Sequence, residues 1–325
     1  MAEKLLLTGA TGFIGSHLTE HLVEKGFDVV AFDRYNPNND WGWLEESPVK
    51  NDVEVILGDI RDFDSVNKAM QGCGTVFHLA ALIGIPYSYV SPLAYIRTNV
   101  EGTYNVLESA KNHELSQVLV TSTSETYGSA QYVPIDEKHP AVGQSPYSAT
   151  KISADQMALS YFLSFETPVK IVRPFNTYGP RQSARAIIPT VISQILAGKT
   201  ELSLGSLNPT RDLTFVKDTC SGFLEIYKSN NLFGSATNIG MNQEISIGDL
   251  VKKIADLIGV NVTINSDKDR VRPNNSEVNR LMCDNSKLLK HTDWQPQYDL
   301  SAGLQETIDW IKSNREYFKP DTYSV

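Results

Sequence analysis

The chain has 325 residues, a formal net charge of -9 and a charged fraction of 21%. Such an acidic chain lacks the basic surface that nucleic acids and anionic membranes require, so we expect neither as a partner. The three cysteines, Cys73, Cys220 and Cys283, have no metal-like spacing, and the N-terminus lacks the apolar core of a signal peptide. These features predict a cytoplasmic protein with no disulfide framework and no metal site.

The first half alternates short apolar runs, expected as strands, with segments of helical periodicity. The expected strands are Leu5–Leu7, Val29–Phe32, Val53–Leu57, Val76–Leu79, Val118–Val120 and Val169–Val172. The expected helices are Phe13–Lys25, closed by Gly26, and Phe63–Met70, Leu93–Asn112 and Tyr147–Phe165. This alternation predicts an α/β fold with a Rossmann-type, doubly wound parallel sheet covered on both faces.

After Pro174 the alternation loosens. The expected helices there are Ile187–Ala197, Lys217–Lys228, Ile247–Ile258 and Ala302–Ser313, and the expected strands are Glu201–Leu204 and Ala236–Ile239. We expect residues 1–175 to form a cofactor-binding domain. Residues 176–325 then form a smaller C-terminal substrate-binding lobe, part of which returns to the sheet.

A glycine-rich segment, Gly9-Ala-Thr-Gly-Phe-Ile-Gly15, lies between the first expected strand and the first expected helix. Glycines there allow a tight turn and a close approach of the backbone to a pyrophosphate, which the helix N-terminus also attracts. An ordinary strand–helix turn is the alternative. The strand before it and the helix after it favour a dinucleotide site.

Asp33 ends the second expected strand, 18 residues after Gly15. A carboxylate there can accept hydrogen bonds from both ribose hydroxyls of NAD and repels the 2′-phosphate of NADP. The neighbouring Arg34 leaves NADP open, and a surface aspartate is the plainer interpretation. Asp59 follows the third strand, either near the adenine or as a helix N-cap. The small residues in His78-Leu-Ala-Ala81 let a backbone run close to the cofactor.

Tyr147-Ser-Ala-Thr-Lys151 opens a long expected helix, so the tyrosine and the lysine share one face. A lysine ammonium beside a phenol favours the phenolate and lowers its pKa. Such a tyrosine can exchange a proton with a sugar hydroxyl while a hydride moves to or from nicotinamide. The alternative is a solvated helix face, and the position after the fifth strand favours catalysis.

A hydroxyl-rich loop, Thr121-Ser-Thr-Ser-Glu-Thr-Tyr-Gly128, follows the fifth expected strand. Ligands of α/β sheets bind at this carboxyl edge. Thr123 is therefore a candidate to contact a substrate hydroxyl, and Glu125 is a candidate acid or base. A capped polar loop is the alternative for the hydroxyls.

Several motifs taken together resemble the extended short-chain dehydrogenases/reductases that modify nucleotide sugars. They are Thr8–Gly15, Asp33, His78–Ala81, Tyr147-x-x-x-Lys151 and Arg173-Pro-Phe-Asn-Thr-Tyr-Gly-Pro-Arg181, and the likeness runs from about Lys4 to Trp310. The resemblance implies an NAD-dependent enzyme with a nucleotide-diphosphate sugar as substrate. It also implies a homodimer, because related enzymes pair two helices equivalent to Leu93–Asn112 and Tyr147–Phe165 from each subunit.

The resemblance assigns roles residue by residue. The catalytic residues are Thr123, Ser124, Glu125, Tyr147 and Lys151. The cofactor contacts are Gly9, Thr11, Gly12, Phe13, Ile14, Gly15, Asp33, Arg34, Asp59, Ile60, Leu79, Ala80, Ala81, Asn99, Thr121, Tyr147, Lys151 and Pro174. The substrate contacts are Thr123, Asn176, Arg185, Ile188, Arg211 and Arg272. Arginine binds phosphate oxygens in a bidentate way, which suits Arg211 and Arg272. For Arg270 and Arg280 we expect surface salt bridges instead.

The carboxylate after Thr123 bears on the reaction. Epimerases of the family need no acid there, whereas a 4-keto group acidifies the C5 proton, which Glu125 could remove as the C6 hydroxyl leaves. Dehydratases of dTDP-glucose carry an aspartate where this chain has Ser124. The Thr-Ser-Glu form resembles both GDP-mannose 4,6-dehydratases and UDP-glucuronate decarboxylases, so this loop leaves loss of water and loss of carbon dioxide open.

Four further segments resemble the N-acetylglucosamine-nucleotide dehydratases of the legionaminic-acid pathway: Tyr35–Leu44, Ile85–Tyr89, Ala130–Glu137 and Gln182–Pro189. We therefore expect an NAD-dependent 4,6-dehydratase of GDP- or UDP-N-acetylglucosamine. The alternatives are a UDP-glucuronate decarboxylase, a nucleotide-sugar 4-epimerase, an oxidoreductase that releases NADH, and a non-catalytic NAD sensor.

Overall fold

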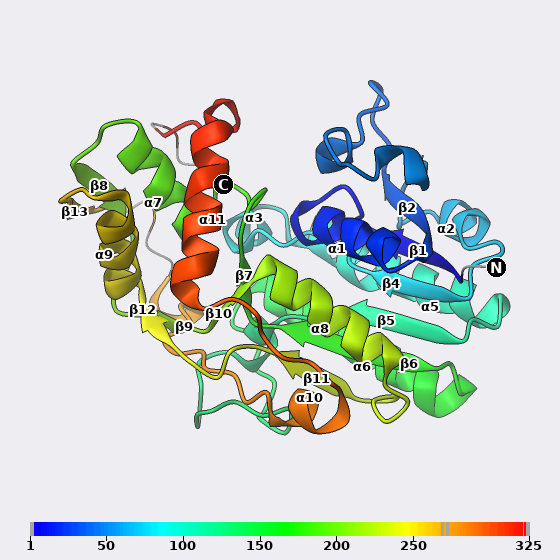
Figure 1. The fold of residues 1–325 in the computed structure, drawn as a ribbon. Coiled ribbons are helices and arrows are strands. Elements are labelled where there is room, and N and C mark those ends of the chain that lie inside the picture. The colour runs from blue at the N-terminus through cyan, green and yellow to red at the C-terminus, as the bar shows by residue number, and fades with distance from the viewer. Residues whose placement is uncertain (1–2, 268–269, 271–272, 321, 323–325) are drawn as a thin grey trace.

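Seven parallel strands form the central sheet of the computed structural model, which describes residues 3–267, 270, 273–320 and 322. Their order across the sheet is β11-β6-β5-β4-β1-β2-β3 (Figure 1). In chain order they are β1 (Lys4–Thr8), β2 (Asp28–Arg34), β3 (Val53–Gly58), β4 (Thr75–His78), β5 (Gln117–Thr121), β6 (Val169–Pro174) and β11 (Ala236–Ile239). The expected α/β fold with a doubly wound parallel sheet is confirmed.

Apolar residues of the central strands are buried on both faces of the sheet. Leu5, Leu6 and Leu7 of β1 are all fully buried, and the strand pairs with β2 on one side and β4 on the other. A continuous apolar run is the pattern that a parallel strand covered on both faces requires.

Helices cover the sheet on both sides. On one face lie α1 (Phe13–Glu24) and α8 (Val216–Lys228), and on the other lie α2 (Phe63–Ala69), α5 (Gly102–Asn112) and α6 (Pro146–Phe165) (Figure 1). Ser145 begins α6 with a capping box, in which the Ser145 side chain accepts from the Ser148 backbone and the Ser148 side chain accepts in return. This box fixes the first turn, which carries Tyr147.

The expected single helix Leu93–Asn112 is interrupted. The chain forms α4 (Pro92–Tyr95), then a π-helical segment, η3 (Ile96–Glu101), and then α5. Asn99 lies within the π-helical turn, and its side chain is 1% exposed. Periodicity cannot reveal such a turn, because it differs from an α-helix by one extra residue per turn.

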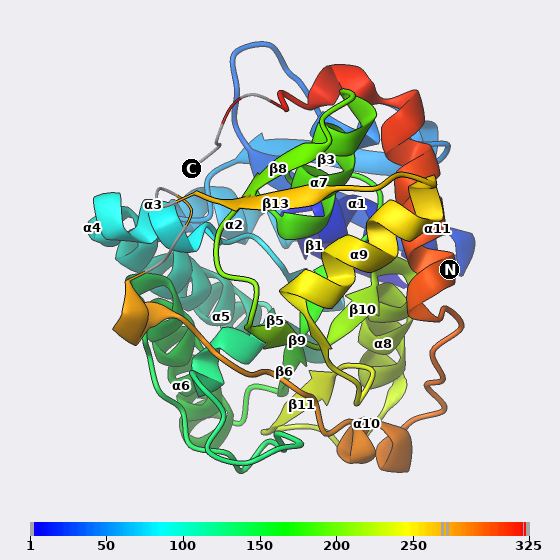
Figure 2. The same ribbon diagram turned by 90° about the vertical axis from the view of Figure 1, so that its left-hand side faces the viewer.

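The smaller lobe consists mainly of α7 (Ile187–Leu196), α9 (Ile247–Ile258), α11 (Leu300–Ser313), β8 (Glu201–Leu204) and β13 (Thr263–Ser266) (Figure 2). From the same half of the chain, α8 and β11 lie in the sheet layer. Short elements complete the description: α3 (Ile85–Val90), β7 (Asn176–Tyr178), β9 (Thr210–Arg211), β10 (Leu213–Phe215), β12 (Ile245–Ser246) and α10 (Ser286–His291).

One hydrophobic core joins the sheet to the smaller lobe, since residues such as Leu5, Ile188 and Leu304 belong to the same buried cluster. A second contact runs through Trp43, in the segment after β2. Its ring packs against Trp310 of α11 and against Tyr317, at centroid distances of 5.4 and 4.9 Å. The two parts of the chain therefore pack tightly.

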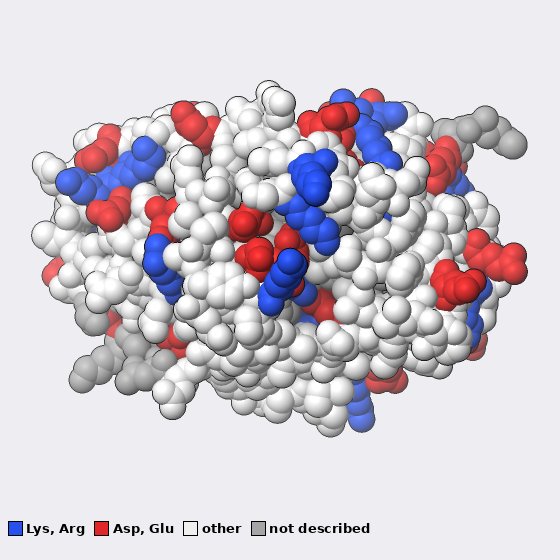
Figure 3. Space-filling model, turned by 90° about the horizontal axis from the view of Figure 1, so that it is seen from below, with Lys and Arg blue, Asp and Glu red and all other residues white. Residues whose placement is uncertain are grey.

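The face of the molecule seen in Figure 3 is mixed in charge. On the face shown in Figure 3, basic and acidic side chains lie next to each other without a broad area of one sign. Among the described residues, no helix is long and apolar enough to span a membrane, and no group of three metal-ligating side chains occurs. Cys73, Cys220 and Cys283 are buried and free of disulfides.

The turn between β1 and α1 depends on the absence of a side chain at Gly15. A Cβ atom there would lie 2.0 Å from the Gly9 carbonyl oxygen, which is a backbone atom that cannot swing aside. Gly15 lies within α1, where alanine is normally favoured by about 1 kcal/mol. The clash is larger than this gain, because overpacking costs about 1–3 kcal/mol.

We predict that Gly15→Ala lowers the free energy of unfolding by up to about 2 kcal/mol in urea denaturation, which is the overpacking cost less the helix gain. Gly74→Ala is the matched control, because a Cβ there would lie 3.5 Å from the Glu3 side chain, an ordinary contact. A Gly15→Ala protein as stable as the wild type would show that the turn can relax.

Candidate active site

A cavity of about 1100 Å³ lies at the carboxyl ends of the sheet strands and faces the smaller lobe. Almost every residue that the sequence analysis assigned to a site lines it. These residues are Gly9, Thr11, Gly12, Phe13, Ile14, Gly15, Asp33, Arg34, Asp59, Ile60, Leu79, Ala80, Ala81, Thr121, Thr123, Ser124, Glu125, Tyr147, Lys151, Pro174, Asn176, Arg185, Ile188 and Arg211. Asn99 is not part of the wall, and Arg272 lies outside the described residues.

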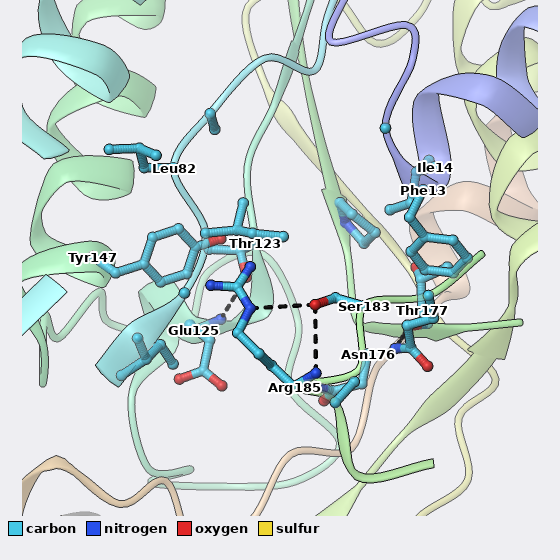
Figure 4. Close-up of a pocket in the computed structure, with 18 of the residues that line it drawn as sticks. Phe13, Ile14, Leu82, Thr123, Glu125, Tyr147, Asn176, Thr177, Ser183 and Arg185 are labelled. Atoms are coloured by element: carbon cyan, nitrogen blue, oxygen red, sulfur yellow. Dashed lines mark hydrogen bonds between the residues drawn. The ribbon is translucent and has the colours of Figure 1, made fainter. Parts of the chain in front are cut away.

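The N-terminus of α1 opens into the cavity. Gly12 is the N-cap and provides no side-chain acceptor, and the first turn contains no acidic residue. Phe13 and Ile14 of this turn stand on one wall (Figure 4). Backbone N–H groups and the positive end of the helix thus form an anion site at the cavity wall.

Asp33 lies at the end of β2 and is held by the glycine-rich turn. Its Oδ2 atom accepts from the backbone and hydroxyl of Thr11, at 2.9 and 2.6 Å, and its Oδ1 atom accepts from the Arg34 N–H. This carboxylate lines the cavity close to the α1 N-terminus. The arrangement is suited to a ribose next to a pyrophosphate.

Asp59 lies on the same wall and pairs with Arg61, whose hydrogen bond lowers the pKa of that carboxyl. The alternative that Asp59 caps a helix is wrong, because the N-cap of α2 is Asp62, which accepts from the Asp64 backbone.

The end of β4 is held by a buried polar chain. The His78 ring hydrogen-bonds Thr8 and Thr103, at 2.8 and 3.1 Å, and the Thr8 hydroxyl accepts from the Ala80 N–H. Burial lowers the pKa of His78 to about 3, so the ring is neutral. Leu82 follows this strand end, and the side-chain amide of Asn99 hydrogen-bonds both the N–H and the carbonyl of its backbone. Asn99 thus positions this wall without lining it.

Tyr147 and Lys151 lie one turn apart on α6, and both are buried. The Lys151 ammonium donates to the Thr121 carbonyl, and burial lowers its pKa to about 8. Sequence reasoning predicts a lowered pKa for Tyr147, but in the structure it is raised. Burial is the main cause and the Glu125 carboxylate adds to it, whereas a hydrogen bond with Thr123 opposes it. The raised pKa favours the protonated phenol.

The hydroxyl-rich loop forms the short helix η4 (Ser124–Tyr127), with Thr123 as its N-cap. The Thr123 hydroxyl accepts from the Glu125 N–H at 3.3 Å. The Tyr147 ring points toward Thr123, and the Glu125 carboxylate lies below them on the same side of the cavity (Figure 4). A phenol, a hydroxyl and a carboxylate therefore converge on one region, which is the requirement for acid–base chemistry on a polyol.

The opposite wall belongs to the second half of the chain. Asn176 faces the cavity, and its Oδ1 atom is buried with no hydrogen-bond partner within the described residues. The Arg185 guanidinium extends from the Ser183 side toward Thr123 (Figure 4), with Nε 3.2 Å from the Ser183 hydroxyl. Ile188 is buried beneath this loop.

Arg211 lies further along this wall. Its guanidinium donates to the Thr210 and Val278 carbonyls and pairs with Glu277 at 3.1 Å. Arg280 pairs with Glu244 on the surface, as expected. Arg270 also forms an ion pair, with Asp267, but unlike a surface arginine it borders the cavity.

Two features escaped sequence reasoning. Glu277 lines the cavity and pairs with Arg211, although no motif marks it. Beneath the cavity, Arg173 and Asp155 form a buried ion pair at 2.6 Å. An arginine within the apolar strand Val169–Pro174 was the available signal, because buried charges require partners.

Comparisons with known proteins identify the family of this chain. The GDP-mannose 4,6-dehydratase family model matches residues 6–307. A dTDP-glucose 4,6-dehydratase of Streptomyces antibioticus is 31% identical, with 97% of this chain and 94% of that protein covered.

Two solved structures show the same fold over nearly the whole chain. The dTDP-glucose 4,6-dehydratase DesIV of Streptomyces venezuelae, solved with NAD bound, has a TM-score of 0.88 and 27% identity, covering 98% of this chain and 99% of that one. A UDP-N-acetylglucosamine 4-epimerase of Methanobrevibacter ruminantium has a TM-score of 0.86 and 27% identity, covering 97% and 100%. The chain belongs to the GDP-mannose 4,6-dehydratase family of NAD-dependent nucleotide-sugar dehydratases and epimerases, within the extended short-chain dehydrogenases/reductases.

Proposed function

We propose that this protein is an NAD-dependent nucleotide-sugar 4,6-dehydratase that acts on GDP- or UDP-N-acetylglucosamine and yields the 4-keto-6-deoxy sugar. The observation that carries the proposal is the position of Glu125, a buried carboxylate on the cavity wall beside Thr123 and Tyr147. A 4-epimerase needs no carboxylate there, whereas elimination across C5 and C6 needs a base.

The residues of the first half fit NAD. The N-terminus of α1 offers free N–H groups for the pyrophosphate, and Asp33 offers carboxylate oxygens for the ribose hydroxyls. A carboxylate in that place disfavours the 2′-phosphate of NADP. We assign residues 1–175 to the NAD-binding domain and residues 176–325 to the nucleotide-sugar lobe, with β11 and α8 contributed to the sheet layer.

NAD supplies a ring that reversibly accepts hydride, and the side chains of the site handle the protons. Tyr147 takes the C4 hydroxyl proton as its phenolate, a form that the Lys151 charge on the same helix face and the positive nicotinamide of bound NAD would favour over the protonated phenol. Thr123 hydrogen-bonds Tyr147 and holds the sugar hydroxyl in line. Glu125 then removes the proton at C5, which the 4-keto group has made acidic.

Ser124 replaces the aspartate that dTDP-glucose dehydratases carry. Ser124 is 2% exposed and lies on the cavity wall. In this chain Glu125 is the carboxylate of the loop, and we assign it both the removal of the C5 proton and the delivery of that proton to the departing hydroxyl. The 6-deoxy product would then need the hydride from C4 returned to C6 and a proton at C5, which the Tyr147 phenol can supply, so the hydride is recycled internally and no NADH is consumed.

We assign the binding of the nucleotide diphosphate to Arg211 and the binding of the sugar to Asn176, Arg185 and Ile188. All four residues line the lobe side of the cavity. Arg272 remains a proposed contact of the diphosphate, and Asn99, predicted as a cofactor contact, is proposed to support the cofactor site through the Leu82 backbone. The amino sugar is supported by the four segments that resemble legionaminic-pathway dehydratases, two of which, 85–89 and 182–189, include cavity-lining residues. We propose that the product enters that pathway in the cytoplasm.

Mass spectrometry of the products tests the function. The purified protein is incubated with UDP- and GDP-N-acetylglucosamine, GDP-mannose, dTDP-glucose and UDP-glucuronate. Loss of one water from an N-acetylglucosamine nucleotide is the expected result. The substrate that loses water also shows whether the nucleotide is GDP or UDP. Loss of carbon dioxide from UDP-glucuronate would assign the loop to a decarboxylase, and an isomer of unchanged mass would assign a 4-epimerase.

Replacing the proposed base separates oxidation from elimination. In Glu125→Gln we expect turnover to fall by about 10²–10⁴-fold, while absorbance of reduced nicotinamide appears because C4 oxidation persists. Tyr147→Phe is the contrasting variant, in which neither oxidation nor product appears. Full turnover by Glu125→Gln would remove Glu125 from the mechanism. Net NADH release in proportion to product would indicate an ordinary oxidoreductase. An active Tyr147→Phe variant would exclude Tyr147 as a catalytic residue.

We also propose a homodimer through the outer surface of α4, η3, α5 and α6. These elements contact one another and line one edge of the molecule (Figure 2). They expose large apolar side chains, among them Leu93, Ile96, Tyr104 and Leu163, the last 78% exposed. Monomers rarely expose an apolar surface of this kind.

Sedimentation at micromolar concentration is expected to give a dimer, and Leu163→Glu is expected to shift the protein toward the monomer. Leu289→Glu is the matched control, because Leu289 is an exposed leucine on α10, outside this surface. A wild-type monomer would reject the assignment, and equal effects of the two variants would place the interface elsewhere.

A further inference from the structure

Asp155 lies on α6 one turn after Lys151, beneath the cavity, and is 2% exposed. One of its carboxylate oxygens, Oδ2, accepts from the Ser122 hydroxyl and from the Arg173 guanidinium, each at 2.6 Å. The other, Oδ1, is buried and has no hydrogen-bond partner within the described part of the chain. A carboxylate held this way keeps a negative charge inside the protein.

Arg173 extends this network to the far end of the catalytic loop. Its Nη1 atom donates to the Tyr127 hydroxyl at 2.7 Å, and its guanidinium carbon lies 4.7 Å from the centre of the Tyr127 ring. The Tyr127 hydroxyl in turn donates to Asn238. Ser122 and Tyr127 bracket Thr123–Glu125, so one buried ion pair holds both ends of the segment that carries the proposed base.

Beyond its ion pair with Arg173, the Asp155 charge also acts on Lys151. Burial lowers the pKa of Lys151 to about 8, and the Asp155 carboxylate opposes that effect. Residues four apart on a helix are neighbours, whereas Tyr147 is eight residues away, about 12 Å along the axis. The carboxylate also raises the pKa of Tyr147, but as a lesser cause than burial.

Other charged or titratable groups lie on the elements packed around this part of α6. They are His78 on β4, Tyr87 on α3, Tyr95 on α4, Arg97 and Glu101 on η3, Glu108 and Lys111 on α5, Glu125 on η4, and Lys170 and Arg173 on β6.

Most of these groups are neutral, screened or paired elsewhere. His78 is neutral, and Arg97 and Glu101 are exposed to solvent. Glu108 and Lys111 pair with each other, and Lys170 donates to carbonyls at the end of α8. Asp155 is the charged group that acts on Lys151 from inside the protein.

We propose that Asp155 is a positioning residue that keeps Lys151 protonated and, through Arg173 and Ser122, holds Thr123–Glu125 against Tyr147. The inference rests on the proposed roles of Tyr147 and Lys151. Because Asp155 is not part of the cavity wall, its effect must pass through these residues.

The charge on Lys151 can be titrated without any substrate. The protein is labelled with [ε-¹³C]lysine, and the Lys151→Met variant identifies the Lys151 resonance by its loss. The titration midpoint of that resonance is then measured in the wild type and in Asp155→Asn. We expect the midpoint to fall by about one pH unit, since loss of a nearby opposite charge shifts a pKa by at least that much. Ser122→Ala removes a hydrogen bond without removing charge, so its midpoint is expected to stay unchanged.

Asp155→Asn leaves the Arg173 guanidinium unpaired in the core, which destabilises the fold. If the single variant does not fold, Asp155→Asn combined with Arg173→Gln leaves no unpaired charge and serves in its place. The wild type itself is also decisive, because a Lys151 midpoint below pH 7 would mean that Asp155 does not keep the lysine protonated.

The reaction provides a second measurement. With the midpoint one unit lower, the protonated fraction of Lys151 at pH 8 falls about fivefold. The rate of C4 oxidation in Asp155→Asn is therefore expected to fall about fivefold at pH 8 and less at pH 6.5, with Asp155→Glu restoring the profile. An unchanged Lys151 midpoint overturns the inference, whereas a shifted midpoint in a protein that forms no dehydrated product counts only against the proposed function.

Discussion

The site depends on the close approach of two backbone segments, at Gly9 and Gly15. Their contact leaves no space for a side chain and places the N-terminus of α1 over the carboxyl edge of the sheet. The same turn brings the Thr11 hydroxyl and N–H to Asp33 at the end of the neighbouring strand. An anion site and a carboxylate for a ribose thus come from one local geometry, and the other walls of the cavity are built around it.

A second constraint is the cost of placing charge inside the protein. His78 remains neutral, the pKa of Lys151 is lowered to about 8, and Arg173 is compensated by Asp155. Each of these groups holds a segment of the cavity wall through its hydrogen bonds. The buried polar groups therefore hold the loops in position, while Tyr147, Thr123 and Glu125 remain directed at the cavity.

Much of this architecture follows from the sequence, because the alternation of strands and helices, the glycine turn and the i,i+4 pair are encoded locally. The helix expected at Tyr147–Phe165, for example, is present as Pro146–Phe165. The raised pKa of Tyr147 could not be predicted, because it depends on burial in the folded protein and on the charge of groups distant in sequence, such as Glu125. The partners of Arg173 and Arg211 are likewise set by tertiary contacts, with Asp155 and Glu277.

The π-helical turn at Ile96–Glu101 restricts the number of residues that this segment can contain. It contains one more residue than an α-helix of the same rise, and that residue lets Asn99 reach the Leu82 backbone while α5 still packs on the sheet. If the same residues were wound as a regular α-helix, everything beyond them would be rotated by about 100°. Insertions and deletions in this region are therefore constrained even where side chains are free to vary, so the chain length of the segment is itself a functional property.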